Sequence, residues 1–486
     1  MKWLRAFGLL GIAVLLTMPA QAQKSADTLR VAWRDRVNDP DPYFAASRTG
    51  LVLAHQVWDT LIFRDPATGI FKPLLATGWR WVDDTTLEFP LRPNVKFHNG
   101  DAFTAADVVY TVATSGPFEW LAGSLAIDPL TVQLKLKRPM PAALEYIAAT
   151  LPILPQTYRS RVGRAGFSAA PIGTGPYRIA SFTSGKIELE RFAGYFDGGA
   201  KGSARIGRIT ITQLADATAE LDALLNNRAD WIWQFNPELY DPIARESLVT
   251  AQRQEAPRIA QLTLNPAPGT PLADLRVRQA IMHAINRQAF IRQFTHNPAK
   301  IPDAPCVPAQ FGCDTAAAVR WDYAPEKARA LLAAAGFGKG FDTDIISTGV
   351  APSWATAIQS DLAATGIRAR ITVLSPTEAL PSAGMLLSAF GAGGIYDVSA
   401  ILPTYFGGGA ADLAHDKTLI TLLDKAATQM DPAARKLTYA SAIHMMTEQA
   451  YVLPLSSLLT LYGVSRTLEV KPTADEMPRF FWMKWK

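Results

Sequence analysis

The segment from Val95 to Val112 constrains the fold most, because it passes from strand to helix through one tight turn. Asn99-Gly100 is a dipeptide typical of such turns, since both residues tolerate a positive φ. Thr104 followed by Asp107 predicts a capping box, and the valines after it recur at helical spacing. A strand joined to a helix in this way is typical of α/β folds.

The same alternation continues along the chain. We predict strands at residues 28–33, 79–82, 87–89, 130–136, 177–182, 187–191, 230–236, 259–264, 368–373 and 451–462. We predict helices at residues 51–63, 276–294, 325–335, 353–365, 419–430 and 433–449. A chain of 486 residues is too long for one hydrophobic core, so the pattern predicts an α/β protein with two lobes.

Charge excludes one class of partner. The formal net charge is only +5, and the lysines and arginines are scattered along the chain. No basic stripe with interleaved aromatic residues is present, so nucleic acid is not an expected partner.

The first 22 residues have the pattern of a secretory signal peptide. Lys2 and Arg5 precede an apolar run at residues 6–18, and Ala20-Gln-Ala22 matches the small-x-small cleavage site. The run is too short to span a membrane. Cleavage after Ala22 leaves Gln23 rather than a cysteine, so we expect a periplasmic protein that is not a lipoprotein.

Two cysteines, Cys306 and Cys313, then lie in oxidising surroundings. We expect a local disulfide that stabilises the fold by roughly 2–3 kcal/mol. A metal site is the alternative, but neither a Cys-x-x-Cys motif nor a nearby histidine pair accompanies them.

Motifs of common enzymes do not occur. There is no His-Glu-x-x-His, no Gly-x-Ser-x-Gly and no Walker-type loop, and the six histidines never lie three or four residues apart. We therefore expect no enzyme, no cofactor and no bound metal. An exported hydrolase stays open as an alternative of another class.

Three segments carry a family resemblance. They are Leu91–Asp101 with residues 104–110, Pro171–Arg178 and Leu275–Arg287. Their amino-acid sequences and their order along the chain resemble those of the peptide/nickel class, or family 5, of periplasmic solute-binding proteins that serve ABC importers. The resemblance spans nearly the whole mature chain.

This resemblance implies a two-lobed periplasmic binding protein of class II, cluster C type, with a hinge and an enlarged, subdivided first lobe. We place the first lobe at residues 23–262 and 456–486 and the second at residues 263–455. The implied function is to bind a small organic solute in the interlobe cleft and deliver it to the membrane permease. Family members close on their solute like a hinge, and we expect a monomer.

Candidate cleft residues of the first lobe come from two strands. Trp33, Arg34 and Asp35 lie at the carboxyl end of the first strand, where ligands bind in open α/β sheets, although a surface ion pair beside a core tryptophan fits equally. The strand at residues 230–236 places three aromatic residues on one face, either for packing or as a stacking platform next to Asn236. These aromatic residues are Trp231, Trp233 and Phe235.

Residues 388–398 resemble the ligand-binding segment of the family. Phe390 fits its aromatic position, but the aspartate that holds a peptide's amine in peptide binders is replaced by Gly393. Tyr396 and Asp397 resemble the Tyr-Asp of nickel-chelate binders. Trp120 resembles a pocket tryptophan of nickel-binding relatives, or is a core residue.

The carboxylate-binding arginine of dipeptide binders has no counterpart here. No cation occurs between Lys339 and Arg368, where Trp354 lies instead, and residues 151–156 lack the arginine of nickel binders. A plain dipeptide would leave unpaired buried charges, so the resemblance implies an opine-like conjugate, a modified peptide, a sugar derivative or another neutral solute. Arg34 and Asp397 are the expected charged contacts. A nickel or metallophore-chelate receptor, sensitive to changes at Trp120, Tyr396 or His415, is the alternative.

Overall fold

The computed structural model describes residues 27–45, 47–115, 118–183, 185–294, 299–375, 378, 384–391 and 393–486. The predicted signal peptide lies outside these residues. Within them, no helix has the length and apolar character needed to cross a bilayer.

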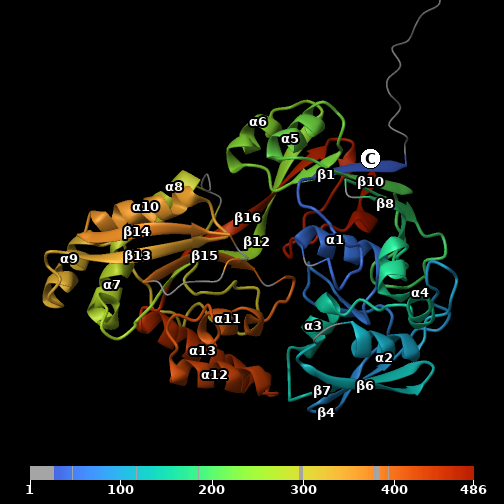
Figure 1. Cartoon of the computed structure of the whole chain (residues 1–486), viewed down its shortest axis with the longest axis horizontal. Coiled ribbons are helices and arrows are strands. Elements are labelled where there is room, and N and C mark those ends of the chain that lie inside the picture. The colour runs from blue at the N-terminus through green and yellow to red at the C-terminus, as the bar shows by residue number, and fades with distance from the viewer. Residues whose placement is uncertain are drawn as a thin grey trace, which may run out of the picture.

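One ten-stranded sheet runs through both halves of the molecule (Figure 1). In spatial order its strands are β14 (Ile367–Leu374), β13 (Phe341–Thr348), β15 (Met385–Gly391), β12 (Val249–Leu264), β16 (Val452–Ser465), β11 (Trp231–Trp233), β1 (Thr28–Trp33), β10 (Arg208–Gln213), β9 (Lys186–Arg191) and β8 (Tyr177–Thr183). The long antiparallel pair β12 and β16 crosses from one half to the other. Its register shifts between Glu255 and Ile259.

Each half also contains helices. The half with the N-terminus contains α1 (Arg48–Val57), α2 (Ala105–Thr114), α3 (Ala143–Thr150), α4 (Gln156–Ala169), α5 (Ala217–Leu225) and α6 (Tyr240–Ala244). The other half contains α7 (Leu275–Ala284), α8 (Arg287–Phe294), α9 (Pro325–Ala334), α10 (Pro352–Ala363), α11 (Leu402–Phe406), α12 (Lys417–Thr428) and α13 (Pro432–Glu448). Among the described residues, 3₁₀ turns lie at Pro237–Leu239, Pro271–Ala273, Val398–Ala400 and Phe480–Trp482.

Small sheets enlarge the N-terminal half. A four-stranded sheet has the order β4 (Arg80–Asp83), β5 (Thr86–Pro90), β7 (Thr131–Leu136) and β6 (Leu121–Asp128), and α2 packs on β6 and β7. Two-stranded pairs are β2 (Ile62–Arg64) with β3 (Phe71–Pro73), and β17 (Leu468–Glu469) with β18 (Lys484–Trp485). This subdivided half agrees with the predicted enlarged lobe.

The predicted start of α2 is confirmed. Gly100 has a φ of +94°, as the turn requires, and the Thr104 amide donates a hydrogen bond of 2.8 Å to the Asp107 carboxylate. The second Asp107 oxygen accepts the Gln156 amide at 2.8 Å. The capping residue therefore also fixes the start of α4.

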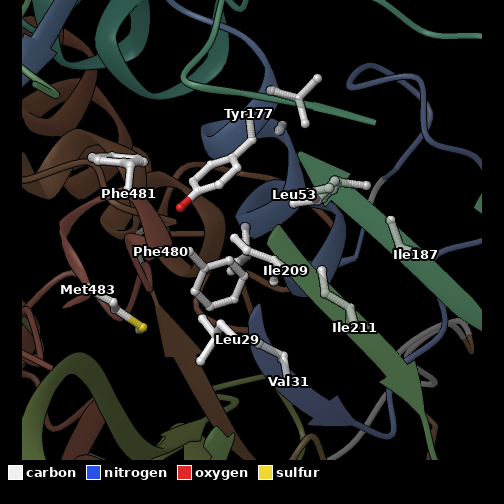
Figure 2. Close-up of a cluster of buried hydrophobic side chains, with 14 of the residues drawn as sticks. Leu29, Val31, Leu53, Tyr177, Ile187, Ile209, Ile211, Phe480, Phe481 and Met483 are labelled. Atoms are coloured by element: carbon white, nitrogen blue, oxygen red, sulfur yellow. The ribbon is translucent and has the colours of Figure 1, made fainter. Parts of the chain in front are cut away.

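The C-terminal segment completes the core of the N-terminal half. Phe480, Phe481 and Met483 are buried in one cluster with Leu29 and Val31 of β1 (Figure 2). The other half has its own core between β12, β13, β15 and the helices α7 to α10. Separate cores on one continuous sheet are the observed form of the two predicted lobes.

Two predicted helices differ from the structure. The helix predicted at residues 51–63 begins at Arg48, after the N-cap Ser47, and ends at Val57, because Trp58 adopts extended backbone. The helix predicted at residues 276–294 breaks at Ile285, which is also extended. Asn286 restarts it as α8, since its side-chain oxygen accepts the Ala289 amide at 2.9 Å.

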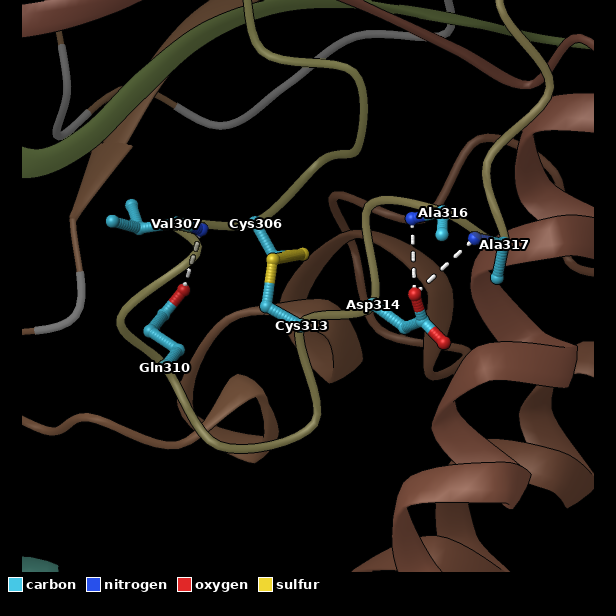
Figure 3. Close-up of a disulfide and its surroundings, with 7 residues drawn as sticks. All are labelled: Cys306, Val307, Gln310, Cys313, Asp314, Ala316 and Ala317. Carbon is cyan, nitrogen blue, oxygen red and sulfur yellow. Dashed lines mark hydrogen bonds between the residues drawn. A yellow bond between two sulfur atoms is a disulfide. The ribbon is translucent and has the colours of Figure 1, made fainter.

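The predicted disulfide between Cys306 and Cys313 is present, with the two Cα atoms 5.7 Å apart (Figure 3). The Gln310 side chain accepts the Val307 amide within the closed loop, at 2.9 Å. Phe311 in the same loop pairs with the backbone of Asp397. The disulfide loop is thereby attached to the predicted ligand-binding segment.

Candidate ligand-binding site

A cavity of about 320 Å³ lies between the two halves, beside the crossing strands. The N-terminal half contributes Pro237, Glu238, Tyr240 and Asp241. The crossing strands contribute Arg253, Arg258, Leu458, Leu459 and Leu461. The other half contributes Phe294, Gly349, Val350, Ala351, Trp354 and Ala389. A solute in this cavity contacts both halves, which is the condition for ligand-driven closure.

Trp354 forms the aromatic wall of the cavity. Pro352 starts α10 just before it, where proline is favoured because its fixed φ suits the first helical turn. The Trp354 ring lies 6.0 Å from the ring of Phe294 and 5.1 Å, edge-on, from that of Phe290. The structure thus places the predicted Trp354 on the interlobe cavity.

Arg258 brings a positive charge to the cavity from β12. It pairs in register with Gly391 of β15, and a Cβ atom at Gly391 would lie 2.5 Å from the Arg258 Cγ. The arginine stem therefore lies across β15 where only glycine leaves room. Its Nε is 3.1 Å from the Glu476 carboxylate, and burial lowers the pKa of the guanidinium although Glu476 opposes this.

Glu476 binds two arginines at once. It pairs with Arg48 as well as with Arg258, and its other oxygen accepts the Thr460 hydroxyl. The Glu476 side chain is only 5% exposed. Because Thr460 belongs to β16 and Arg258 to β12, this carboxylate joins the C-terminal segment to both crossing strands.

The part of the cavity next to Tyr240 carries more negative than positive charge. The Arg253 guanidinium lies 5.1 Å from the centre of the Tyr240 ring. Glu238 and Asp241 flank that ring and are exposed. No ion pair of these three charged residues occurs in the part of the chain that the structure describes.

Phe390 faces the other side of the sheet. Successive strand residues alternate between faces, so Ala389 lines the cavity while Phe390 points away from it. The Phe390 ring packs 5.3 Å from that of Tyr405, in a cluster that includes Tyr146 of α3. This cluster is a second contact between the halves, separate from the cavity.

Tyr396 belongs to this second contact. Its amide donates to Glu145 at 3.1 Å, and the Arg64 guanidinium lies 3.8 Å from the centre of its ring. Arg64 and Glu145 also pair at 2.9 Å. Burial raises the pKa of Glu145, against the influence of Arg64.

Comparison with known proteins identifies the family. Residues 71–412 match the model described as the middle part of bacterial extracellular solute-binding proteins, family 5. The chain belongs to this family. It is therefore an extracytoplasmic solute receptor of an ABC importer.

Relatives of this family 5 receptor bind varied solutes. It is 29% identical to the glutathione-binding protein GsiB of Salmonella typhi over 392 residues, which are 77% of this chain and 73% of that protein. Among solved structures, Campylobacter jejuni NikZ in complex with Ni(L-His) has 21% identity and a TM-score of 0.79, covering 94% of this chain and 98% of that one. AgaA with agropinic acid, from A. tumefaciens R10, has 22% identity and a TM-score of 0.77, covering 94% and 99%. These two structures share the fold.

Asp397 has a structural partner. Both its oxygens accept hydrogen bonds from Arg435, at 2.7 and 2.8 Å, and both side chains are 3% exposed. Asp397 also caps the turn at Val398–Ala400 by accepting the Ser399 amide. The expected ligand contact is thus replaced by an internal ion pair of the receptor.

Arg34 also fails to line the cavity. It pairs with the buried Glu220 at 2.5 Å and donates to the Gln234 carbonyl at 2.9 Å. Trp33 is buried in the core, and Asp35 is exposed at the end of β1. The alternative interpretation, an ion pair beside a core tryptophan, describes Trp33 and Arg34.

The aromatic strand does not form a platform in this structure. β11 ends at Trp233 because Gln234 has a φ of +55°, so Phe235 turns to the cluster on the opposite side of the sheet. Trp231 is buried against Phe480 and Tyr462, and Trp233 is buried against Trp231. Only Asn236 approaches the cavity, as the residue before Pro237, whose turn it caps by accepting the Glu238 amide.

The remaining candidates lie elsewhere. Trp120 is half-buried against Phe118 and Tyr146, near the second interlobe contact. His415 is exposed beside α12. Among the described residues, no three His, Cys, Asp or Glu side chains gather as metal ligands would.

Sequence reasoning missed the charged residues of the cavity. Arg253 and Arg258 lie on β12, which the sequence presented as an extended connection between lobes. Their role depends on Gly391 and Glu476, which are distant in the chain. Arg258 directly precedes the strand predicted at residues 259–264, and this position is the signal that could have pointed to it.

Proposed function

We propose that the receptor binds its solute in the interlobe cavity and passes it unchanged to the permease. The lining of the cavity by both halves carries this proposal, because a solute there stabilises the closed form. We assign residues 23–262 and 456–486 to the first lobe and residues 263–455 to the second, and the separate cores support this division. After cleavage at Ala22 the protein acts in the periplasm, as a monomer and without a lipid anchor.

The proposed solute is a small organic molecule such as a peptide-like compound or an opine-like conjugate. Relatives that bind glutathione and agropinic acid support these classes. The expectation against a plain dipeptide rests on a missing cation. Arg253 and Arg258 remove that ground, so dipeptides belong among the solutes to test.

A metal chelate is the second candidate, favoured by the likeness to NikZ with Ni(L-His). A chelate carries its own metal ligands and needs only shape and charge from the protein. The alternative from another functional class is an exported hydrolase. Such an enzyme would convert its substrate into a product instead of closing on an unaltered solute.

Small-angle scattering and thermal shift test the proposal with dipeptides, glutathione, agropinic acid and Ni(L-His). We expect one class to compact the protein and raise its melting temperature, with no product formed. Trp354→Ala should weaken binding of that solute about tenfold or more. The control variant Tyr323→Ala, at an exposed residue, should leave its binding unchanged. Binding that is unaffected by Trp354→Ala, or a chemically altered solute, would refute the proposal.

A further inference from the structure

We propose that Arg258 recognises an anion in the interlobe cavity, and that the preferred solute carries a single carboxylate beside an apolar body. This inference rests on the proposed function, since it assumes that the cavity is the solute site.

The position of Arg258 is built by its neighbours. The stem lies over Gly391, where an added Cβ would come within 2.5 Å of Cγ and 2.9 Å of Cδ. The side chain is 28% exposed, and its buried Nε faces the Glu476 carboxylate at 3.1 Å without a well-aligned hydrogen bond. A guanidinium has five N–H donors, and a partly exposed one is suited to a carboxylate, which accepts two hydrogen bonds from its planar fork.

The inner end of the cavity has a surplus of positive charge. Arg258 and Arg48 share the single carboxylate of Glu476. The neighbouring Asp475 cannot compensate, because it is held by Arg479 at 2.9 and 2.6 Å. One solute carboxylate at Arg258 would balance this group of charges in surroundings where an unpaired charge is costly.

The outer end argues against a second carboxylate. Glu238 and Asp241 line the cavity next to Tyr240, and Arg253 lies over the Tyr240 ring. A dicarboxylate that reached Arg258 would bring its second charge towards these two carboxylates. Electrostatic repulsion therefore favours a monocarboxylate.

The middle of the cavity suits an apolar body. Trp354 and Phe294 form one wall, and Leu458, Leu459 and Leu461 of β16 line another part of the cavity. Aromatic and branched aliphatic groups bury well against such walls. The geometry points to an aryl or branched alkyl carboxylate, including an N-acylated amino acid.

The test is a paired library of aryl, branched alkyl and N-acylated amino-acid monocarboxylates, each with its primary amide and a dicarboxylate analogue. Native mass spectrometry and thermal shift rank binding to the full-length mature protein. We expect acids to bind about tenfold or more tightly than their amides, and monocarboxylates more tightly than dicarboxylates. Amides that bind as well as acids, or a preference for dicarboxylates, would overturn the proposal.

Two variants act on Arg258 in different ways. Arg258→Gln should remove the preference for acids over their amides. Gly391→Ala keeps the charge but displaces the stem, and should reduce acid binding while the protein stays folded. Unchanged acid binding in both variants would refute the role of Arg258.

Scattering separates this inference from the proposed function. Closure by neutral members of the library, lost in Trp354→Ala, would uphold the cavity as the solute site and refute the anion role. Absence of closure by any member, including the acids, would count against both.

Discussion

Asp397 and Arg435 form a two-pronged ion pair inside one lobe, with both carboxylate oxygens bound and both side chains almost fully buried. Removing one member of a buried pair leaves the other charge without compensation. Asp397→Asn should therefore lower the free energy of unfolding by about 3–5 kcal/mol, measured by urea denaturation. The exposed pair Arg138–Asp424 is the control, and Asp424→Asn should cost less than about 1 kcal/mol. If Asp397→Asn lost solute affinity while its stability stayed unchanged, Asp397 would be a ligand contact after all.

Glu220 should make stability depend on pH. Burial raises its pKa to about 7, although Arg34 beside it opposes the rise. Between its ordinary value of about 4.5 and about 7, the folded state then holds more protons than the unfolded state, so stability falls as pH rises. We expect the wild type to lose stability relative to Glu220→Gln across this window. Parallel curves for the two proteins would contradict the raised pKa.

The disulfide should stabilise both the fold and the Tyr396 segment. Replacing Cys306 and Cys313 by serine should lower the free energy of unfolding by about 2–3 kcal/mol, because a short closed loop is released in the unfolded chain. Phe311 of that loop accepts the Val398 amide and donates to the Tyr396 carbonyl. Hydrogen exchange should therefore speed up at residues 396–398. Exchange that rises uniformly along the chain would argue against this local connection.

Trp233 should affect stability and not solute binding. Its ring is buried beside Trp231 and under Arg48, away from the cavity lining. Trp233→Ala should cost about 3–5 kcal/mol in chemical denaturation, and the folded variant should retain wild-type affinity. Trp231→Phe, which keeps a ring, should cost less than Trp231→Ala. If variants of Trp231 or Trp233 with normal stability lost affinity for the solute, the predicted stacking platform would be supported instead.

Local signals in the sequence predicted local structure well. The Thr104–Asp107 cap, the disulfide and the βα alternation depend on neighbouring residues, and all appear in the structure. The resemblance of three segments led to the family, which the match to residues 71–412 confirms.

Side-chain partners were predicted poorly, because they come from distant segments. Asp397 looked available until the fold brought Arg435 to it, from 38 residues away. Trp231 became a core residue through contact with Phe480 of the C-terminal segment. The break at Ile285 is likewise supported from a distance, since the Asn286 amide donates to Asp361 of α10.

The crossing strands have a consequence for recognition by the permease. β12 and β16 pair on both sides of the register shifts at Glu255/Ile259 and Ala260/Gln261, so we expect the two halves to bend relative to each other at this place. A bend at this one place would change the spacing between surface points on the two halves together. A membrane partner could distinguish loaded from empty receptor by a single spacing on its surface, whatever the chemistry of the solute.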